Sequence, residues 1–329
     1  MIDLAIVGLG RWGRVLVESV QGRSDAVRFT HAVTGTPAHA ADYCRAHGLE
    51  LRPTLEEVLA DSGVHGVVLA TPHSLHEAQV IAAAAAGKAV FCEKPFTLTV
   101  AAAERAVAAA ERAGIVLAVG HNRRFLPALR RMHGWIEEGR IGRALHVEGN
   151  ISSHVGGRYA PDSWRLDTEE SPAGGMAGAG IHLVDAMIHL LGPIAEVQAQ
   201  SFRLAHDVPL DDTTSMLFRF ESGATGYLAT LTATAPTFRL QVFGEAGSLE
   251  LRSPTVLEHV PLGGERTLWT FPAVDIERAQ LEAFASAIAG GPAFPVPLDE
   301  VVAGIRAFEA VPVSATEHRR ILLDRTPIT

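Results

Sequence analysis

Three glycines follow the first apolar run of the chain at a spacing that suits a diphosphate. Gly8, Gly10 and Gly13 form the pattern G-x-G-x-x-G between a predicted strand and a predicted helix. The first glycine permits a tight turn, the second lets the backbone approach a pyrophosphate, and the third allows the helix to pack closely on the strand. Free N–H groups at the helix start would face the phosphates. We therefore expect a dinucleotide at this turn, with Arg11 and Trp12 beside it; a tight turn without a ligand is the alternative.

The end of the second predicted strand bears on which nicotinamide cofactor binds. A carboxylate about 20 residues after the glycine pattern would hold the ribose of NAD, whereas an arginine would favour NADP. The sequence reads Val33-Thr34-Gly35-Thr36 at this place. No carboxylate is there to repel a 2′-phosphate, and the hydroxyls of Thr34 and Thr36 and the side chain of Arg11 could hold one. The sequence therefore favours NADP over NAD.

A second polar group, Glu93-Lys94-Pro95, follows the predicted strand Ala89–Cys92. The carboxyl ends of parallel strands are the edge at which open α/β sheets bind ligands. A lysine at this edge can hydrogen-bond a substrate oxygen or, with a lowered pKa, carry its proton. A surface charge pair between Glu93 and Lys94 is the alternative. Cys92 has no evident partner base, so we expect it to be a buried strand residue rather than a nucleophile.

Another loop at the same edge contains two histidines. Ala70-Thr71-Pro72 ends the predicted strand Val64–Ala70, and His73 and His76 follow it. A cofactor bound at the glycine turn would pass this loop, so we expect these residues to line it. Positions at the start of the next helix are the alternative reading of the two histidines.

The segment from His182 to His189 could carry acid–base or metal chemistry. His182, Asp185 and His189 lie near one face of a predicted helix, as metal ligands can. No second ligand set accompanies them, so a metal-dependent enzyme is the lesser alternative and we expect no metal. Asp185 could instead orient the imidazole of His182.

The elements that must hold the first three groups alternate between strand and helix. The predicted strands are Ile2–Val7, Val27–Val33, Val64–Ala70, Ala89–Cys92 and Ile115–Val119. The predicted helices are Arg14–Val20, Pro37–His47, Leu55–Ala60, Ser74–Ala86 and Thr99–Ala113, with Thr54 and Glu57 forming a capping box. This alternation predicts an α/β Rossmann domain, a doubly wound parallel sheet, over residues 1–120.

From residue 121 onward the pattern is that of an α+β domain. The predicted strands are Ala144–Ser152, Ala195–Arg203, Thr214–Phe220, Ala224–Thr232, Arg239–Phe243 and Ser248–Arg252. The predicted helices are Pro127–Glu138, Ile181–Leu190 and Ile276–Ala289. Short glycine turns join several strands, which indicates an antiparallel sheet in residues 121–329.

Composition restricts the class of partner. With 329 residues and 47% hydrophobic residues, the chain can bury two cores, and its net charge of -9 argues against nucleic acid or an anionic membrane as partner. Two cysteines are too few for a disulfide framework. We see no secretory signal, and no apolar run approaches the ~20 residues that cross a bilayer. A cytoplasmic protein is expected.

Together these motifs resemble the glucose-fructose oxidoreductase/inositol dehydrogenase/rhizopine-catabolism (Gfo/Idh/MocA) family. The resemblance covers essentially the whole chain, and its motifs are Gly8–Gly13, Ala70-Thr71-Pro72, Glu93-Lys94-Pro95, Asn122-Arg123-Arg124-Phe125, Trp164-Arg165 and Gly174–Asp185. It implies a Rossmann domain followed by an α+β domain with an open, mainly antiparallel sheet. That sheet would form the contacts of a homo-oligomer, a dimer or tetramer. The resemblance also implies a cis Lys94-Pro95 bond.

The resemblance also assigns roles to residues. Lys94 matches the catalytic lysine of the family and His182 its catalytic histidine. The residues implied at the nicotinamide and on the substrate side are Glu93, Asn122, Arg123, Trp164, Arg165 and Asp185. Many members have an aspartate four residues before the histidine, and this chain has Gly178 there. The usual proton relay of the family is therefore incomplete.

The expected function is that of an NAD(P)-dependent oxidoreductase. It would transfer a hydride between the nicotinamide and a C–OH/C=O carbon of a small polyhydroxylated or cyclic diol substrate, namely a sugar, a cyclitol or a carboxylated dihydrodiol. Arginines in or near the motifs suit a carboxylate: Arg123, Arg124, Arg130, Arg131, Arg158 and Arg165. The opening turn and Met176–His182 resemble the branch of phthalate cis-dihydrodiol dehydrogenases. The alternative, suggested by Gly178, is a non-catalytic NAD(P)-binding sensor or regulator on the same fold.

Overall fold

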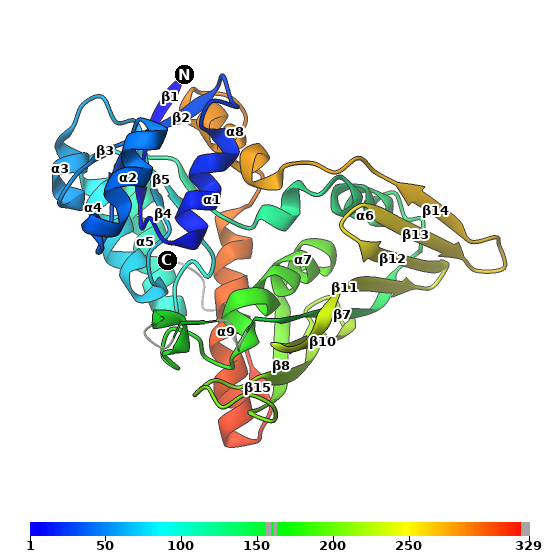
Figure 1. Ribbon diagram of the computed structural model, residues 1–329. Helices are drawn as coiled ribbons and strands as arrows, with labels where there is room; N and C mark the ends of the chain where they lie inside the picture. Colours follow the sequence, from blue (N-terminus) through cyan, green and yellow to red (C-terminus); the bar gives the residue numbers. More distant parts are fainter. Residues whose placement is uncertain (156–158, 161–162, 324–329) are drawn as a thin grey trace. The chain divides into compact units, whose positions relative to one another are not determined.

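Six parallel strands in the order β3-β2-β1-β4-β5-β6 form the first sheet (Figure 1). They are β1 Ile2–Val7, β2 Val27–Val33, β3 Glu50–Leu51, β4 Gly66–Leu69, β5 Ala89–Cys92 and β6 Leu117–Val119. The direction of winding changes between β1 and β4, the point at which doubly wound sheets bind ligands. The predicted Rossmann sheet is confirmed, and the short strand β3 is an addition to it.

The helices around this sheet begin and end close to the predicted residues. They are α1 Arg11–Val20, α2 Pro37–His47, α3 Leu55–Ala60, α4 His76–Ala85, α5 Val100–Ala113 and α8 Ile276–Ile288. Right-handed crossovers leave the centre of the sheet in opposite directions, so α1 and α4 cover opposite faces. Thr54 caps α3, since its Oγ1 accepts the Glu57 N–H at 3.3 Å. Helix α1 starts three residues earlier than predicted, directly after the glycine turn.

The computed structural model describes residues 1–155, 159–160 and 163–323, which divide into two compact units. The first comprises Met1–Thr97, Ala101–Asn122 and Asp275–Leu298, and the second comprises Leu98–Val100, Arg123–Val274 and the chain from Asp299 onward. A single boundary near residue 120 was expected. The units differ from that expectation chiefly because Leu281 and Phe284 of α8 are buried in the core of the first unit.

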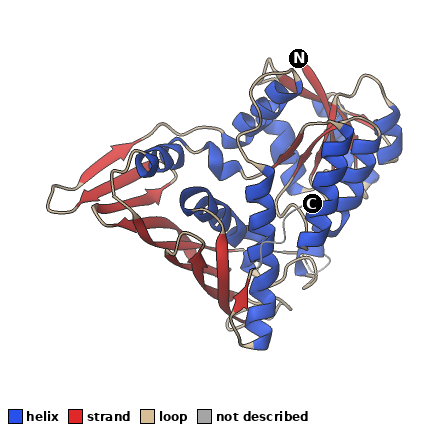
Figure 2. Ribbon diagram, turned by 180° about the vertical axis from the view of Figure 1, so that it is seen from behind, coloured by secondary structure: helices blue, strands red, loops and turns tan. Residues whose placement is uncertain are grey.

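The second unit is built on a nine-stranded sheet, shown in red in Figure 2 with the order β14-β13-β12-β11-β7-β10-β9-β8-β15. Its strands are β7 Ala144–His154, β8 Ile194–Phe202, β9 Thr213–Phe220, β10 Thr225–Leu231, β11 Ala233–Gly244, β12 Gly247–Ser253, β13 Val256–Pro261, β14 Thr267–Thr270 and β15 Ile321–Leu322. Strands β7 and β10 pair in parallel and the other neighbours pair antiparallel, so the predicted mainly antiparallel sheet is confirmed. Strands β13, β14 and β15 were not predicted.

Three helices accompany this sheet: α6 Pro127–Glu137, α7 Ile181–Leu191 and α9 Leu298–Glu317. Helix α7 contacts β7, and α6 contacts β12 and β13. Along β9 the side chains alternate, with Phe218 buried and Leu217 exposed, as a sheet covered on one face requires. Helix α9 was not predicted, because Gly304 and Pro312 interrupt its helical pattern. Within the described residues, no helix combines the length and the apolar character that a membrane span needs.

Candidate functional site

The turn between β1 and α1 is shaped by two glycines that the backbone requires. Gly8 has φ +95°, and a Cβ there would lie 2.5 Å from the carbonyl oxygen of Ala70. A Cβ on Gly13 would lie 2.0 Å from the carbonyl oxygen of Gly8. Any side chain at either position would force the turn away from β4 or from α1.

Gly10, by contrast, faces open space. A Cβ there would meet no atom within 4 Å, so packing within the chain does not explain the absence of a side chain. Gly10 is the N-cap of α1, no side chain caps the helix, and its first turn contains no acidic residue. The N–H groups and the positive end of the helix dipole are therefore available to an anion. A pyrophosphate fits this turn, with the exposed Arg11 next to it.

Helix α2, which follows the loop after β2, is tied to α1 by a residue that sequence reasoning missed. The guanidinium of Arg14 donates to the carbonyl of His39 at 3.1 Å and lies 4.7 Å from the ring centroid of Tyr43. The Thr36 N–H donates to Thr34 Oγ1 at 3.4 Å. The loop therefore presents two threonine hydroxyls at the end of β2, with the Arg14 guanidinium of α1 beside the start of α2 and no carboxylate between residues 33 and 39.

His76 joins two loops at the carboxyl edge of the sheet. Its ring is fully buried, with Nδ1 3.1 Å from the carbonyl oxygens of Pro95 and Phe96 and Nε2 3.2 Å from that of Thr71. This places the start of α4 against the loop that carries Lys94. His73 is also buried, and its ring lies edge-on to that of His76 at 5.8 Å. The structure thus gives His76 a part in positioning the lysine loop.

Glu93 and Lys94 follow β5, and the Lys94-Pro95 bond is cis, as the resemblance implied. Glu93 is 5% exposed, its Oε2 accepts the Lys94 backbone N–H at 3.2 Å, and its Oε1 lies against Gly120. Burial raises the pKa of Glu93 from 4.5 to about 7, although Trp12 and Lys94 oppose the rise, and the neighbouring Glu277 contributes to it. A carboxyl with this pKa is partly protonated at neutral pH.

Glu277 of α8 is a second residue that sequence reasoning missed. Its Oε1 accepts the Asn122 side-chain N–H at 2.9 Å, across 155 positions of sequence, so no local spacing could reveal it. Two buried polar atoms in this area, Glu93 Oε1 and Asn122 Oδ1, have no hydrogen-bond partner in the described part of the chain, and the Trp12 indole N–H lies close enough to the Glu93 carboxyl to act on it as a hydrogen-bond donor. A nicotinamide carboxamide offers both donors and an acceptor, so this set of groups fits the nicotinamide end of a dinucleotide.

In the second unit, His182 lies in the first turn of α7, directly after a π-helical turn at Met176–Gly180. Single π turns in helices often occur at functional sites. His182 is 8% exposed. Gly178 is exposed, and a Cβ there would meet no atom within 4 Å. The backbone therefore has room for a carboxylate at this position, although the chain has none.

Asp185 and His189 take part in a buried ion network. Asp185 accepts two hydrogen bonds from Arg124, which also donates to Glu300 at 2.6 Å. Glu300 lies 3.6 Å from His189, whose ring stacks on His133 at 3.9 Å. Burial would raise the pKa of Glu300, but His189 and Arg124 lower it to about 2. Within the described residues, no three His, Cys, Asp or Glu side chains gather as metal ligands.

The other expected substrate residues lie in the same unit. Arg165 stacks over the ring of Trp164 at 4.2 Å, and Arg123 lies 5.7 Å from the ring of Phe238. Arg130 donates to the carbonyl of Arg124 at 3.0 Å. Arg131 pairs with Glu138 at 3.6 Å. Arg158 lies outside the described residues.

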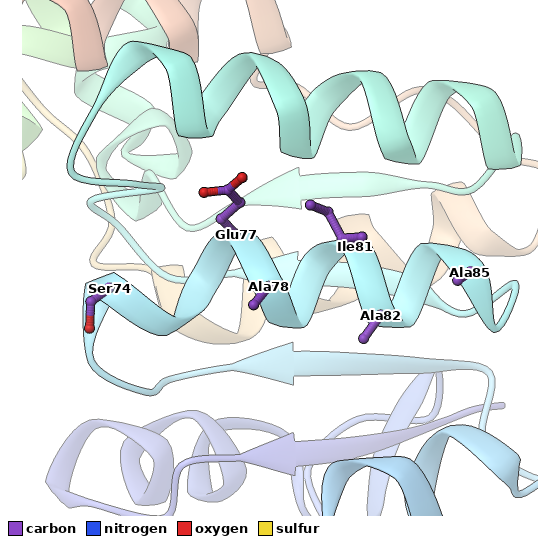
Figure 3. Close-up of a pocket in the computed structure, with 6 residues that line it drawn as sticks. All are labelled: Ser74, Glu77, Ala78, Ile81, Ala82 and Ala85. Atoms are coloured by element: carbon purple, nitrogen blue, oxygen red, sulfur yellow. The ribbon is translucent and has the colours of Figure 1, made fainter.

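A surface groove of about 520 Å³ runs along α4 (Figure 3). All six residues that line it come from this one helix or the turn before it: Ser74, Glu77, Ala78, Ile81, Ala82 and Ala85. Glu77, the one charged residue among them, is bound by Arg105 at 2.6 Å. The groove contains none of the residues described above and is not the candidate site.

Comparison with known proteins gives one family for both units. Residues 2–121 match the GFO_IDH_MocA oxidoreductase family, described as having an NAD-binding Rossmann fold. Residues 129–250 match the GFO/IDH/MocA C-terminal domain.

Relatives of the chain include sugar oxidoreductases. It is 31% identical over 308 residues to the 1,5-anhydro-D-fructose reductase of Ensifer adhaerens, which covers 86% of this chain and 89% of that protein. The aldose-aldose oxidoreductase of Caulobacter crescentus complexed with glycerol has a TM-score of 0.86 and 26% identity, over 98% of this chain and 99% of that one. Levoglucosan dehydrogenase in complex with NADH and levoglucosan has a TM-score of 0.87 and 21% identity over 98% and 100%, a likeness of fold.

Proposed function

Because the chain belongs to the GFO/IDH/MocA family of NAD-binding oxidoreductases, we propose that it transfers a hydride between a bound NAD(P) and a small polyhydroxylated or cyclic diol substrate. The reacting carbon alternates between C–OH and C=O. The observation that carries the proposal is the position of the Glu93-Lys94-Pro95 loop. The loop lies at the carboxyl edge of the parallel sheet, and at the same edge the N-terminus of α1 is open to an anion. The relatives are named as enzymes, and none supports the non-catalytic alternative.

The proposed roles divide the chemistry between cofactor and protein. When bound, the nicotinamide donates or accepts the hydride. Lys94 would hydrogen-bond the reacting oxygen, and His182 would exchange its proton. The residues proposed to hold the rest of the substrate are Arg123, Trp164 and Arg165, and those proposed for the cofactor loops are Ala70, Thr71, Pro72 and His73. Asp185, whose buried carboxylate is held by Arg124, would support His182 from the next turn of α7 instead of contacting the substrate.

The test of this function is turnover of a panel of sugars, cyclitols, carboxylated diols and keto acids with NADH and NADPH. Lys94→Ala should lower kcat by about 100-fold or more, the range typical of a positioned acid–base group. Lys94→Arg keeps the charge but cannot release a proton, so it should restore binding and little turnover. Lys88→Arg is the matched control, because Lys88 and Lys94 are the only lysines in the sequence. A Lys94→Ala protein with the parent rate would contradict the role.

NADP is the proposed cofactor of choice. The loop Val33–Thr36 has no carboxylate, Thr34 and Thr36 carry hydroxyls, and Arg11 and Arg14 lie on the first turns of α1. Such groups suit a 2′-phosphate. The KM for NADPH should be lower than that for NADH. Arg11→Ala should raise the KM for NADPH and leave that for NADH nearly unchanged, so that the two values approach each other. A strong preference of the parent protein for NADH would contradict this assignment.

We also propose a homo-oligomer, a dimer or tetramer, formed through the open face of the nine-stranded sheet in the cytoplasm. Leu217 and Tyr227 are direct neighbours on β9 and β10 and are 54% and 37% exposed. Both cysteines are buried and unpaired, which suits a reducing compartment. Leu217→Lys should lower the mass measured by light scattering to that of the monomer. An unchanged mass would place the contact elsewhere.

A further inference from the structure

The hydrogen bond between Glu277 and Asn122 fixes the direction of a buried amide. A carboxylate can only accept, so the NH₂ group of Asn122 must face Glu277, and the donor–acceptor distance is 2.9 Å. The Asn122 oxygen then points away from Glu277. Asn122 is 4% exposed, and its Oδ1 is buried with no hydrogen-bond partner in the described part of the chain. An acceptor buried in this way requires a donor from outside the described residues.

The surroundings of Asn122 indicate what that donor is. Glu93 is also buried, its Oε1 likewise lacks a partner among the described residues, and the Trp12 indole N–H acts on this carboxyl as a hydrogen-bond donor. The groups that act on the Glu93 carboxyl are Trp12 from α1, the adjoining Lys94, and Glu277 from α8. A planar ligand with an NH₂ group matches these two acceptors, whereas a carboxylate has no hydrogen-bond donor and matches neither.

Glu277 has no separate task as a helix cap. Asp275 already caps α8, because its Oδ1 accepts the Arg278 N–H at 3.0 Å. A second acid in the first turn would add about 0.3–1 kcal/mol through the helix dipole. That contribution alone would not require Glu277 to bind Asn122.

We propose that Glu277 is a positioning residue that turns the Asn122 oxygen toward the bound nicotinamide, so that the site accepts its carboxamide and rejects a carboxylate there. The proposal rests on the proposed function, since it requires that a nicotinamide dinucleotide binds. Beyond hydride transfer, the proposal gives the site a specificity for the carboxamide form of the cofactor. This specificity depends on Glu277, which lies outside the sequence motifs.

The test compares NAD(P)⁺ with its nicotinic acid counterpart, in which the carboxamide is replaced by a carboxylate. The dissociation constants of both are measured by calorimetry on the full chain. The parent protein should prefer the amide by about tenfold or more, because the carboxylate would face an unpaired oxygen. Glu277→Gln should reduce this preference to a few-fold, because the introduced glutamine can donate to the Asn122 oxygen and let the amide reverse.

A double variant separates this effect from loss of structure. Asn122→Asp alone sets two carboxylates against each other and should weaken both ligands. Combined with Glu277→Gln, the introduced amide can donate to the new carboxylate, and the preference for the carboxamide should return. Glu282→Gln, the same change on the same helix, is the matched control and should keep the parent ratio. Thermal unfolding of each variant reports whether it folds.

The outcomes distinguish this inference from the proposed function. A folded Glu277→Gln protein with the parent ratio overturns the inference and leaves hydride transfer untouched. A parent protein that binds NAD(P)⁺ with the expected ratio but turns over nothing in the panel supports the inference and contradicts the enzyme. A parent protein that binds no dinucleotide contradicts both.

Discussion

Arg124 and Asp185 form a two-point ion pair in which both side chains are 2% exposed. The distances are 2.6 Å from Nε to Oδ2 and 2.8 Å from Nη2 to Oδ1. The pair fixes the segment that follows Asn122 to the middle of α7, one turn beyond His182. Breaking a buried pair leaves an uncompensated charge in the interior, which is more costly than never having had the pair.

Asp185→Asn should therefore lower the free energy of unfolding by roughly 3–5 kcal/mol, measured by urea denaturation. Glu245→Gln is the control, because its pair with Arg143 is exposed at 73% and 51% and should change stability by less than about 1 kcal/mol. If Asp185→Asn retains its stability but loses turnover, the aspartate acts through His182 rather than through the fold.

Glu93→Gln tests the raised pKa of the buried carboxyl. A carboxyl whose pKa rises on folding, here from 4.5 to about 7, favours the folded state below pH 4.5, and this advantage disappears as the pH rises through 7. The free energy of unfolding of the variant should therefore rise relative to that of the parent by about 2–3 kcal/mol between pH 4.5 and pH 9. Denaturation of the cofactor-free protein across this range measures the gain. Glu111→Gln, on the exposed side of α5, should follow the parent at every pH.

Gly178→Asp restores the acid that the family pattern has four residues before His182. The open space at Gly178 accepts the side chain without displacing a neighbour. A carboxylate one turn from an imidazole favours its charged form and raises its pKa. If neutral His182 takes the proton during oxidation, the acidic limb of kcat/KM should move up by roughly one pH unit. Gly178→Asn has the same shape without the charge, and an equal shift in that variant would exclude the electrostatic explanation.

The two glycines of the phosphate turn should respond differently to alanine. Gly13→Ala places a methyl group 2.0 Å from a backbone oxygen, so it should destabilise the protein by several kcal/mol. Gly10→Ala meets nothing in the chain and should fold with the parent melting temperature, yet raise the dissociation constant for NAD(P)H because the methyl group enters the phosphate space. Melting curves and fluorescence titration separate the two effects. Equal melting temperatures for both variants would contradict the packing argument.

Local signals in the sequence were enough to predict the Rossmann half. Strand–helix alternation and the glycine spacing predicted β1, β2, β4, β5 and β6 within three residues at either end. The cis bond before Pro95 came from the family resemblance and is confirmed. The second sheet was predicted in part, because its strands beyond Ser253 are short or lie at the edge, where alternation is weak.

What the sequence did not predict depends on contacts between distant residues. Glu277 reaches Asn122, Arg124 reaches Asp185 and Glu300, and Arg14 reaches His39. Hydrogen bonds of this kind leave no periodic trace in the chain. The helix face shared by Asp185 and His189 illustrates the difficulty, because their spacing gave metal ligation as a lesser alternative but could not reveal the distant Arg124 and Glu300 that contact them.

Helix α8 is synthesised late, after most of the second unit, yet it packs in the core of the first unit. The Phe284 ring lies edge-on to that of Phe91 at 5.8 Å, although α8 follows β6 by almost half the chain. At about 5–20 residues per second, translation leaves the first sheet without this cover for roughly ten to thirty seconds. During that interval the nascent chain exposes Phe91 to chaperones, and a chain stalled on the ribosome before Asp275 should be bound by them more strongly than the released protein.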